Sequence, residues 1–238
     1  MILSDYFRKI KHSIGRYNNN KTLVYIHIGK CGGATLKNAI NKSDVIANQY
    51  SKILTVHLVK PPIYNNSHYA IVLRNPIKRA ISAFNWRFKL VVTDQIQKNR
   101  FQNEYSILAK YENLNNLAER LYIGNELDKK VANDFQKIHH LKENISFYLM
   151  PLLDKINKDQ IFAVFVCENL NEDIRAILGV DNKSNVHKND DPIPEYKKTL
   201  SDSGYKNLKR YLSYDYNCIK KAFELKNIKL SSYNKLII

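Results

Sequence analysis

Residues 22–36 read TLVYIHIGKCGGATL and contain three of the seven glycines in the chain. The segment TLVYIHI is rich in β-branched and aromatic residues and is too short for a buried helix, so it predicts a central β-strand. The chain then turns at GKCGG (29–33) and continues as a predicted helix over 33–41, with Leu36 and Ile40 on one face. A strand that ends in a glycine-rich turn and feeds a helix points several backbone N–H groups at one place. The turn is therefore a candidate phosphate-binding loop.

The rest of the chain alternates predicted strands and helices. Further strands are predicted over 53–59 (ILTVHLV), 69–74 (YAIVLR) and 161–167 (IFAVFVC). Helices are predicted from residue 76 to about 90, over 169–179 and over 202–226, with helices and loops over 100–150 and a polar loop over 180–200. This alternation predicts an α/β fold, a single domain over 1–238 with a central, mostly parallel sheet flanked by helices.

Composition narrows the class of protein. The chain has 238 residues, of which 44% are hydrophobic, enough for one substantial core. No apolar stretch approaches the roughly 20 residues that span a bilayer, and no signal-peptide pattern is found, so we expect a cytoplasmic protein. The basic leader over 1–20 predicts a short amphipathic helix, and both a peripheral contact with an anionic membrane and a solvated leader stay open. The cysteines are too few and too scattered for a disulfide framework or a zinc site, and we expect reduced thiols at Cys31, Cys167 and Cys218.

The charge balance concerns binding partners rather than the fold. Lysine and arginine total 38 against 22 acidic residues, which gives a formal net charge of +16. A charge of this size favours an anionic partner. Nucleic acid, anionic lipid, acidic polysaccharide and a phosphorylated cofactor all remain candidates at this point.

The glycine turn differs from two common nucleotide motifs. The Walker pattern places its lysine after the last glycine, whereas Lys30 precedes the glycine pair here, and the dinucleotide pattern GxGxxG is absent. Lys30 would add a mobile positive charge to the turn, and Thr35 a hydroxyl at the start of the helix. The alternative is an ordinary tight turn between a strand and a helix, with an exposed lysine.

A second stretch, IVLRNPIKRAISAFNWRF (71–88), extends the first one. It places Arg74 at the end of a predicted strand and Ser82 eight residues later, in the helix that Asn75-Pro76 opens. Ligands of open α/β sheets bind at the carboxyl ends of the strands, so Arg74 would share a crevice with the glycine turn. An arginine fork and a hydroxyl there would hold a second phosphate group. The alternative is a structural ion pair for Arg74 and a solvent-facing Ser82.

Together, YIHIGKCGGATL (25–36) and VLRNPIKRAISAF (72–84) resemble the two cofactor-binding motifs of sulfotransferases that use 3′-phosphoadenosine 5′-phosphosulfate (PAPS). The resemblance is closer to the carbohydrate branch of that family. It implies a P-loop-like architecture, a cofactor-binding core over 22–90, and transfer of a sulfuryl group to a saccharide hydroxyl, with adenosine 3′,5′-bisphosphate as product and no metal. It implies a 3′-phosphate site at Arg74 and Ser82. It implies a 5′-phosphosulfate loop formed by Lys30, Cys31, Gly32, Gly33, Ala34 and Thr35.

The first motif departs from the family pattern at three positions. Gly29 stands where proline is usual, Cys31 where threonine is usual, and Ala34 where a hydroxyl residue is common. Binding through backbone amides should survive these changes. Beside a helix start and a lysine, Cys31 is either a reactive thiol of lowered pKa or an inert small side chain. The resemblance is weaker beyond residue 90, and residues 95–150 match no motif of the family.

Sulfuryl transfer needs a group that stabilises the leaving phosphate and a base for the acceptor hydroxyl. Lys30 is the natural stabiliser, and the resembled enzymes use a histidine or a glutamate as base. We expect His57, near the carboxyl end of the second strand, to be the base, and His27, inside the first strand, to be a core residue. His187, in the late polar loop, would contact the nucleotide or lie in a solvated turn. The adjacent His139 and His140 cannot share one helix face, which disfavours a metal site.

Two rival functions stay open from the sequence. One is a nucleotide-dependent, kinase-like transferase, although no acidic residue is found beside a Walker-type hydroxyl. The other is a basic nucleic-acid-binding module, which the positive charge and sixteen tyrosines favour but no recognition motif supports. The sulfotransferase hypothesis implies a glycan acceptor, with acidic glycans among the candidates, and no nucleic-acid partner. A surface for an acidic or sugar-stacking acceptor is predicted at Arg79, Trp86, Arg87 and Lys89, although Trp86 is rather expected in the core, since residues 79, 82, 83 and 86 share one helix face.

Overall fold

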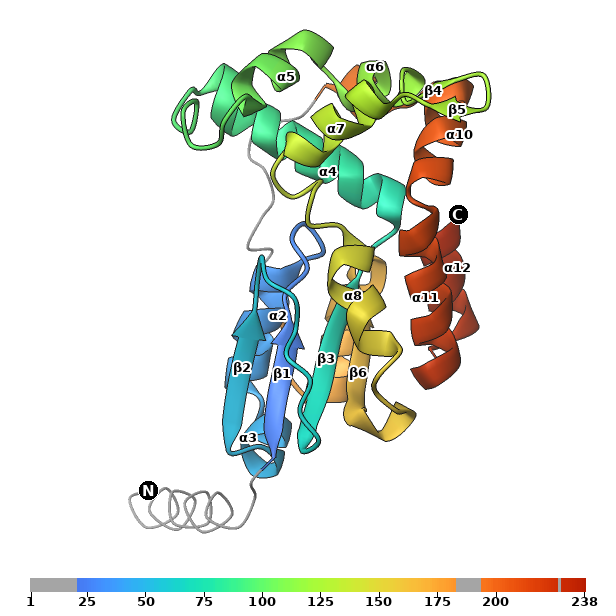
Figure 1. Ribbon diagram of the computed structural model, residues 1–238. Helices are drawn as coiled ribbons and strands as arrows, with labels where there is room; N and C mark the ends of the chain where they lie inside the picture. Colours follow the sequence, from blue (N-terminus) through green and yellow to red (C-terminus); the bar gives the residue numbers. More distant parts are fainter. Residues whose placement is uncertain (1–20, 183–193, 227) are drawn as a thin grey trace.

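The computed structural model describes residues 21–182, 194–226 and 228–238 (Figure 1). The basic leader over 1–20 and His187 lie outside these ranges. Across the described residues, none of the helices combines the length and the apolar character that a membrane crossing requires.

Four parallel strands form the central sheet. Their order is β2-β1-β3-β6, and the pairing is in register from Thr22↔Lys52 to Ile26↔Val56 on one side of β1. The strands are β1 (Thr22–Ile26), β2 (Lys52–Val56), β3 (Ser67–Leu73) and β6 (Ile161–Val166). The predicted α/β class and parallel sheet are thus confirmed.

Helices connect and cover these strands (Figure 1). The α-helices are α2 (Gly33–Lys42), α3 (Asp44–Gln49), α4 (Pro76–Phe88), α5 (Glu104–Tyr111), α6 (Leu114–Glu119), α7 (Lys129–Lys137), α8 (Ile145–Leu153), α9 (Leu170–Asp173), α10 (Asp202–Tyr211), α11 (Ser213–Lys226) and α12 (Leu230–Ile237). Single π-helical turns follow α4 and α9, at η1 (Lys89–Thr93) and η4 (Ile174–Leu178), and short 3₁₀ turns are η2 (Lys158–Gln160), η3 (Cys167–Asn169) and η5 (Glu195–Lys197). A small antiparallel hairpin pairs β4 (Tyr122–Ile123) with β5 (Glu126–Leu127).

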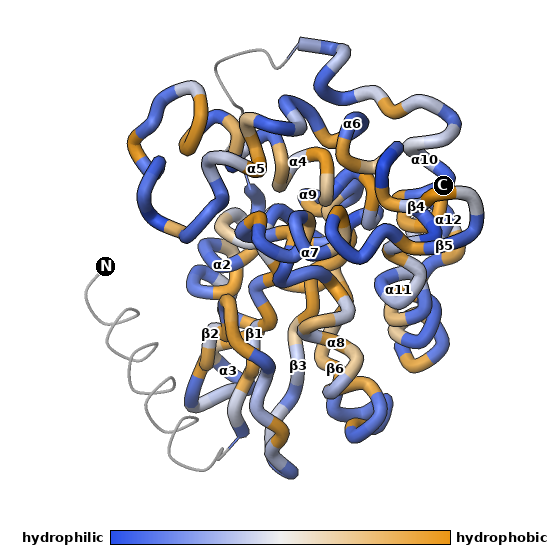
Figure 2. Tube along the Cα trace, turned by 45° about the horizontal axis from the view of Figure 1, so that its top comes forward, coloured by the Kyte–Doolittle hydropathy of each residue, from blue (hydrophilic) through white to orange (hydrophobic). Residues whose placement is uncertain are grey.

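The sheet lies between two layers of helices. In Figure 1, α2 and α3 lie behind it, and α8 lies in front with α11 beside it. The central strand β1 is apolar on both faces, as a strand covered on both sides requires, and Leu23, Val24, Tyr25 and Ile26 are fully buried. Figure 2 shows the hydrophobic residues concentrated along the strands and hydrophilic ones along the outer turns of α2 and α11.

A second group of helices stands above the carboxyl ends of the strands. Helices α4 to α7 and α10, here called the helical unit, enclose a separate hydrophobic cluster around Phe84, Leu117 and Phe135 (Figure 1). The sheet has its own cluster, centred on β1, β3 and β6. The candidate site therefore lies where two cores meet.

Several boundaries differ from the prediction. Strand β2 ends at Val56 rather than residue 59, because Leu58 takes a left-handed conformation (φ 62) that no strand accommodates. The predicted helix over 202–226 is two helices, interrupted at Leu212 (φ −89, ψ 17) without a glycine or a proline. Helix α12 and the hairpin β4-β5 were not predicted.

The connections reverse direction at β1. The chain passes from β1 to β2 on one side and then crosses to β3 on the other side of β1. The carboxyl ends of β1 and β3 therefore form a topological switch point, which is where open α/β sheets bind their ligands.

Candidate active site at the carboxyl ends of the strands

The glycine turn leads directly into the N-terminus of α2. Lys30 (φ 68) and Gly32 (φ 78) are both left-handed, and Gly32 is the N-cap residue without a side-chain cap. Over the described residues, the amides of Gly33, Ala34 and Thr35 donate to no protein group. These free amides and the positive end of the helix dipole form a local anion-binding surface.

The glycines of the turn are required by close side-chain contacts. A Cβ atom at Gly32 would lie 2.7 Å from Leu170 Cδ2, and one at Gly33 would lie 1.9 Å from His27 Cδ2. Neither distance is sterically allowed. The glycine pair therefore lets two side chains approach the loop backbone, besides allowing the conformation of the turn.

Two cations converge on this turn from adjacent strands. The Arg74 guanidinium donates Nη1–H to the Lys30 carbonyl at 3.0 Å, and the Lys30 ammonium lies 4.5 Å from the centre of the Trp86 ring. Burial, and then the positive charges of Arg74 and Arg79, lower the pKa of Lys30 to about 8. Among the described residues, neither Lys30 nor Arg74 forms an ion pair with a carboxylate. The structural ion pair considered for Arg74 is therefore not found there.

Ser82 and Trp86 lie on the face of α4 that is turned toward Lys30. Arg79, Ser82 and Trp86 are spaced by three and four residues, so they share that face, and both ends of the row contact the 29–30 segment. Ser82 is half-buried rather than fully solvent-facing. The sequence placed Trp86 in the core, but it is only partly buried and forms a surface under the Lys30 ammonium.

Cys31 packs into the hydrophobic core of the sheet. Its side chain is fully buried, and burial raises the pKa of the thiol to about 12. The inert interpretation of this cysteine is supported, and the reactive one is not. Its backbone N–H lies 3.4 Å from the Ile28 carbonyl, so the free amides begin after Cys31.

Arg79 and Arg87 are structural, which corrects the predicted acceptor surface. The Arg79 side chain donates Nε–H to the Gly29 carbonyl at 3.0 Å and Nη2–H to the His140 carbonyl at 2.7 Å and to the Glu143 carbonyl. Arg87 forms a bidentate pair with Glu104, at 2.9 and 2.6 Å. Both arginines are about as buried as the core, at 2% and 1% exposure, so neither can contact an acceptor.

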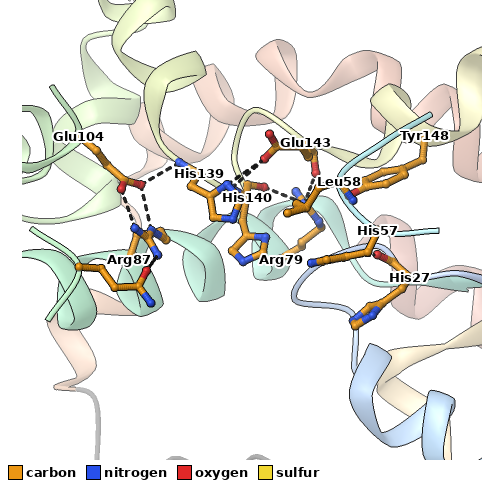
Figure 3. Close-up of polar contacts among 11 residues, drawn as sticks. His27, His57, Leu58, Arg79, Arg87, Glu104, His139, His140, Glu143 and Tyr148 are labelled. Atoms are coloured by element: carbon orange, nitrogen blue, oxygen red, sulfur yellow. Dashed lines mark hydrogen bonds and ion pairs between the residues drawn. The ribbon is translucent and has the colours of Figure 1, made fainter. Parts of the chain in front are cut away.

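His57 lies just beyond the end of β2, with an exposed ring (Figure 3). Its Nδ1 is 3.0 Å from the backbone carbonyl of His27, and because a carbonyl only accepts, the proton resides on Nδ1. Nε2 then carries the lone pair. The next residue, Leu58, donates its N–H to the Tyr148 hydroxyl at 3.2 Å, which fixes the backbone that carries the ring. His57 is thus held in the tautomer that a base acting through Nε2 requires.

His27 also belongs to the site, whereas the sequence placed it in the core. Strand β1 ends at Ile26, and the half-buried His27 ring lies 4.5 Å from the His57 ring and against Gly33. Burial, and then the charges of His57 and Lys37, lower the pKa of His27 to about 4. It is therefore neutral near pH 7.

The strand ends bring together Lys30, Arg74 and His57, together with the free amides of α2. Two residues of this site were not predicted from the sequence. They are Tyr148, which holds Leu58, and His140, whose ring lies 6.0 Å from that of His57. Both come from the 95–150 segment that matched no motif. Across the described residues, no cluster of His, Cys, Asp or Glu side chains has the geometry of a metal site.

Protein-family models, curated protein sequences and solved structures give no significant match to this chain.

Proposed function

We propose that this protein is a PAPS-dependent O-sulfotransferase that transfers a sulfuryl group to a hydroxyl of a saccharide. One observation carries the proposal. Lys30 and Arg74, two cations without carboxylate partners in the described structure, flank the free amides of α2 at the switch point of the sheet. Burial, and then repulsion from Arg74 and Arg79, disfavours the charge on Lys30 and lowers its pKa, and an anion with more than one phosphate group would offset both effects.

The geometry supports a division of the two phosphate groups. The amides of Gly33, Ala34 and Thr35, at the N-terminus of α2, would hold the 5′-phosphosulfate, and the Lys30 ammonium would reach it from the same turn. Arg74 uses one N–H on the Lys30 carbonyl, and its remaining donors would hold the 3′-phosphate, to which the family resemblance adds the Ser82 hydroxyl. Because Arg74 also bonds the Lys30 carbonyl, a movement of Arg74 at the 3′-phosphate position would also move the loop at the 5′ position.

His57 would act as the base. Its Nε2 lone pair accepts the proton of the acceptor hydroxyl while that oxygen forms a bond to sulfur. The bond between sulfur and the bridging phosphate oxygen breaks, and the charge that develops on the leaving phosphate is stabilised by the Lys30 ammonium. Holding acceptor and donor in line is the remaining contribution of the site. The saccharide class of the acceptor rests on the family resemblance alone.

Transfer of labelled sulfate from PAPS to a panel of glycans tests the proposal, with His57→Asn as the matched variant. The asparagine amide reproduces the Nδ1–H donor toward the His27 carbonyl but offers no base. We expect activity in the wild type, its loss in the variant, and unchanged binding of adenosine 3′,5′-bisphosphate. A variant that retains full activity would remove His57 from the mechanism.

A thermal-shift comparison separates the rival functions. We expect adenosine 3′,5′-bisphosphate to raise the melting temperature more than ATP with Mg²⁺ or an oligonucleotide does. Stabilisation by the oligonucleotide alone would favour the nucleic-acid-binding module. Stabilisation by ATP with Mg²⁺ alone would favour the kinase-like transferase.

A further inference from the structure

The loop between α7 and α8 delivers a histidine to the site in a strained conformation. His140 has φ 67, a left-handed conformation that is uncommon for a residue with a side chain. Such conformations cost free energy and persist when the surrounding structure holds them firmly.

Three buried side chains with ionisable groups hold the loop. Arg79 donates to the carbonyls of His140 and Glu143, and Glu104 accepts the N–H of His139 at 2.8 Å. At the far end, Asp215 accepts the N–H of Ser146 at 2.8 Å. The three side chains are 2%, 0% and 1% exposed and come from α4, α5 and α11. The backbone on both sides of His140 is thereby fixed (Figure 3).

The His140 ring enters the glycine turn at Gly29. A Cβ atom at Gly29 would lie 2.5 Å from His140 Nδ1, so any larger residue would collide with the ring. This contact accounts for the glycine at the position where the resembled motif has proline. Gly29 and His140 are thus a matched pair, one from the phosphate loop and one from the helical unit.

The environment of the ring assigns its tautomer. Nδ1 is buried and has no hydrogen-bond partner in the described structure, and a buried N–H without an acceptor is less tolerable than a buried lone pair. The proton therefore resides on Nε2, on the opposite edge from Gly29. Burial, and then the charges of His139, Arg79, Lys30 and His57, lower the pKa of His140 to about 2. The Glu143 carboxylate accepts the backbone N–H of His140 at 3.0 Å.

A neutral imidazole beside Lys30 and His57 is a hydrogen-bond donor that cannot compete as a base. We propose that His140, besides His57, is a ligand-facing histidine. Its Nε2–H would donate a hydrogen bond to an oxygen of the sulfuryl group in the transition state of the transfer. The assignment rests on the proposed function. It adds a residue from the helical unit to a site otherwise built from the strand ends.

Two substitutions at position 140 distinguish this role from a purely structural one. Asparagine tolerates the left-handed backbone best, but its amide reaches only the position of Nδ1. Glutamine suits the backbone less well, but its amide reaches the position of Nε2. A structural role predicts that His140→Asn is the milder change. The donor role predicts the reverse order in turnover.

We expect His140→Gln to keep turnover within about tenfold of the wild type, and His140→Asn to lose about 10²–10³-fold, as loss of one transition-state donor does. Both variants should bind adenosine 3′,5′-bisphosphate as the wild type does, because that product lacks the sulfuryl group. Equal turnover in the wild type and His140→Asn overturns the proposal, as does an equal loss in both variants.

A second readout does not depend on activity. Imidazole ¹⁵N NMR of the full chain should show His140 as the Nε2–H tautomer, with its resonance moving when inorganic sulfate is titrated. An Nδ1–H tautomer, or a resonance insensitive to sulfate, overturns the proposal. Failure of the proposed function would look different, because the wild type itself would then neither bind adenosine 3′,5′-bisphosphate nor transfer sulfate.

Discussion

Two regions of this molecule use arginine in opposite ways. At the strand ends, Arg74 is half-buried, bonds one backbone carbonyl, and lies beside Lys30 with no carboxylate partner in the described structure. In the helical unit, Arg87 is 1% exposed and is neutralised by the bidentate carboxylate of Glu104. The buried arginine thus has its partner inside the protein, whereas the cations at the strand ends would, on the proposed function, be paired by a ligand.

Loss of a buried partner should give the largest effect. Glu104→Ala leaves the Arg87 charge buried without its carboxylate and frees the His139 N–H, so we expect unfolding to become easier by about 3–5 kcal/mol. Urea denaturation measures the change. The matched control is Asp181→Ala, which breaks the exposed pair with Arg175 and should cost less than about 1 kcal/mol. Equal losses in the free energy of unfolding would show that the buried pair stabilises the fold no more than the exposed pair does.

Substitution of Lys30, at the strand ends, should lower turnover and leave the stability of the fold unchanged. Lys30→Ala removes a charge that its neighbours repel, so the fold should be retained, while turnover should fall by about 10²–10³-fold because the leaving phosphate loses its stabilising cation. Steady-state kinetics and thermal unfolding together test this. Lys42→Ala, at the exposed end of α2, is the control and should change neither. Near-normal turnover of Lys30→Ala would remove this residue from the chemistry.

Acid should lower the stability that the buried, neutral His140 contributes where its loop meets the glycine turn. The folded pKa of His140 lies far below the unfolded value of about 6.5, so the unfolded chain takes up a proton first as the pH falls. The contribution of His140 is complete above about pH 6.5 and declines below it, by about 2 kcal/mol at pH 5. His27 acts with the same sign. Denaturation at pH 7.5 and pH 5 should therefore show a smaller acid loss in His140→Asn than in the wild type, and identical losses would contradict the buried, neutral state of His140.

The strand-end region was predictable because its signals are local. The turn at Gly29–Gly33, Arg74 after β3 and His57 after β2 are each adjacent to a strand in the sequence, and parallel strands bring their carboxyl ends to one edge. What the prediction missed in this region is where the strands end. The left-handed Leu58 ends β2 early, and β1 stops at Ile26, so the half-buried His27 follows the strand instead of lying inside it.

The contribution of the helical unit was not predictable. His140 reaches Gly29 across more than a hundred residues, through a loop that Arg79, Glu104 and Asp215 hold from three helices. No local pattern separates an arginine that binds three carbonyls from one that binds a ligand. Arg79 and Arg87 were therefore expected on an acceptor surface. Buried charges follow from tertiary packing, which a pattern of neighbouring residues does not contain.

The central claim is that the strand ends bind a nucleotide with phosphates at both the 3′ and the 5′ positions. Calorimetric titration of the wild type and Arg74→Ala with adenosine 3′,5′-bisphosphate and adenosine 5′-phosphate tests it most directly. We predict that Arg74→Ala weakens the bisphosphate by about tenfold or more, since a charge-assisted hydrogen bond is lost, and leaves the monophosphate nearly unchanged. An equal loss for both ligands, or no binding of the bisphosphate by the wild type, would contradict the account.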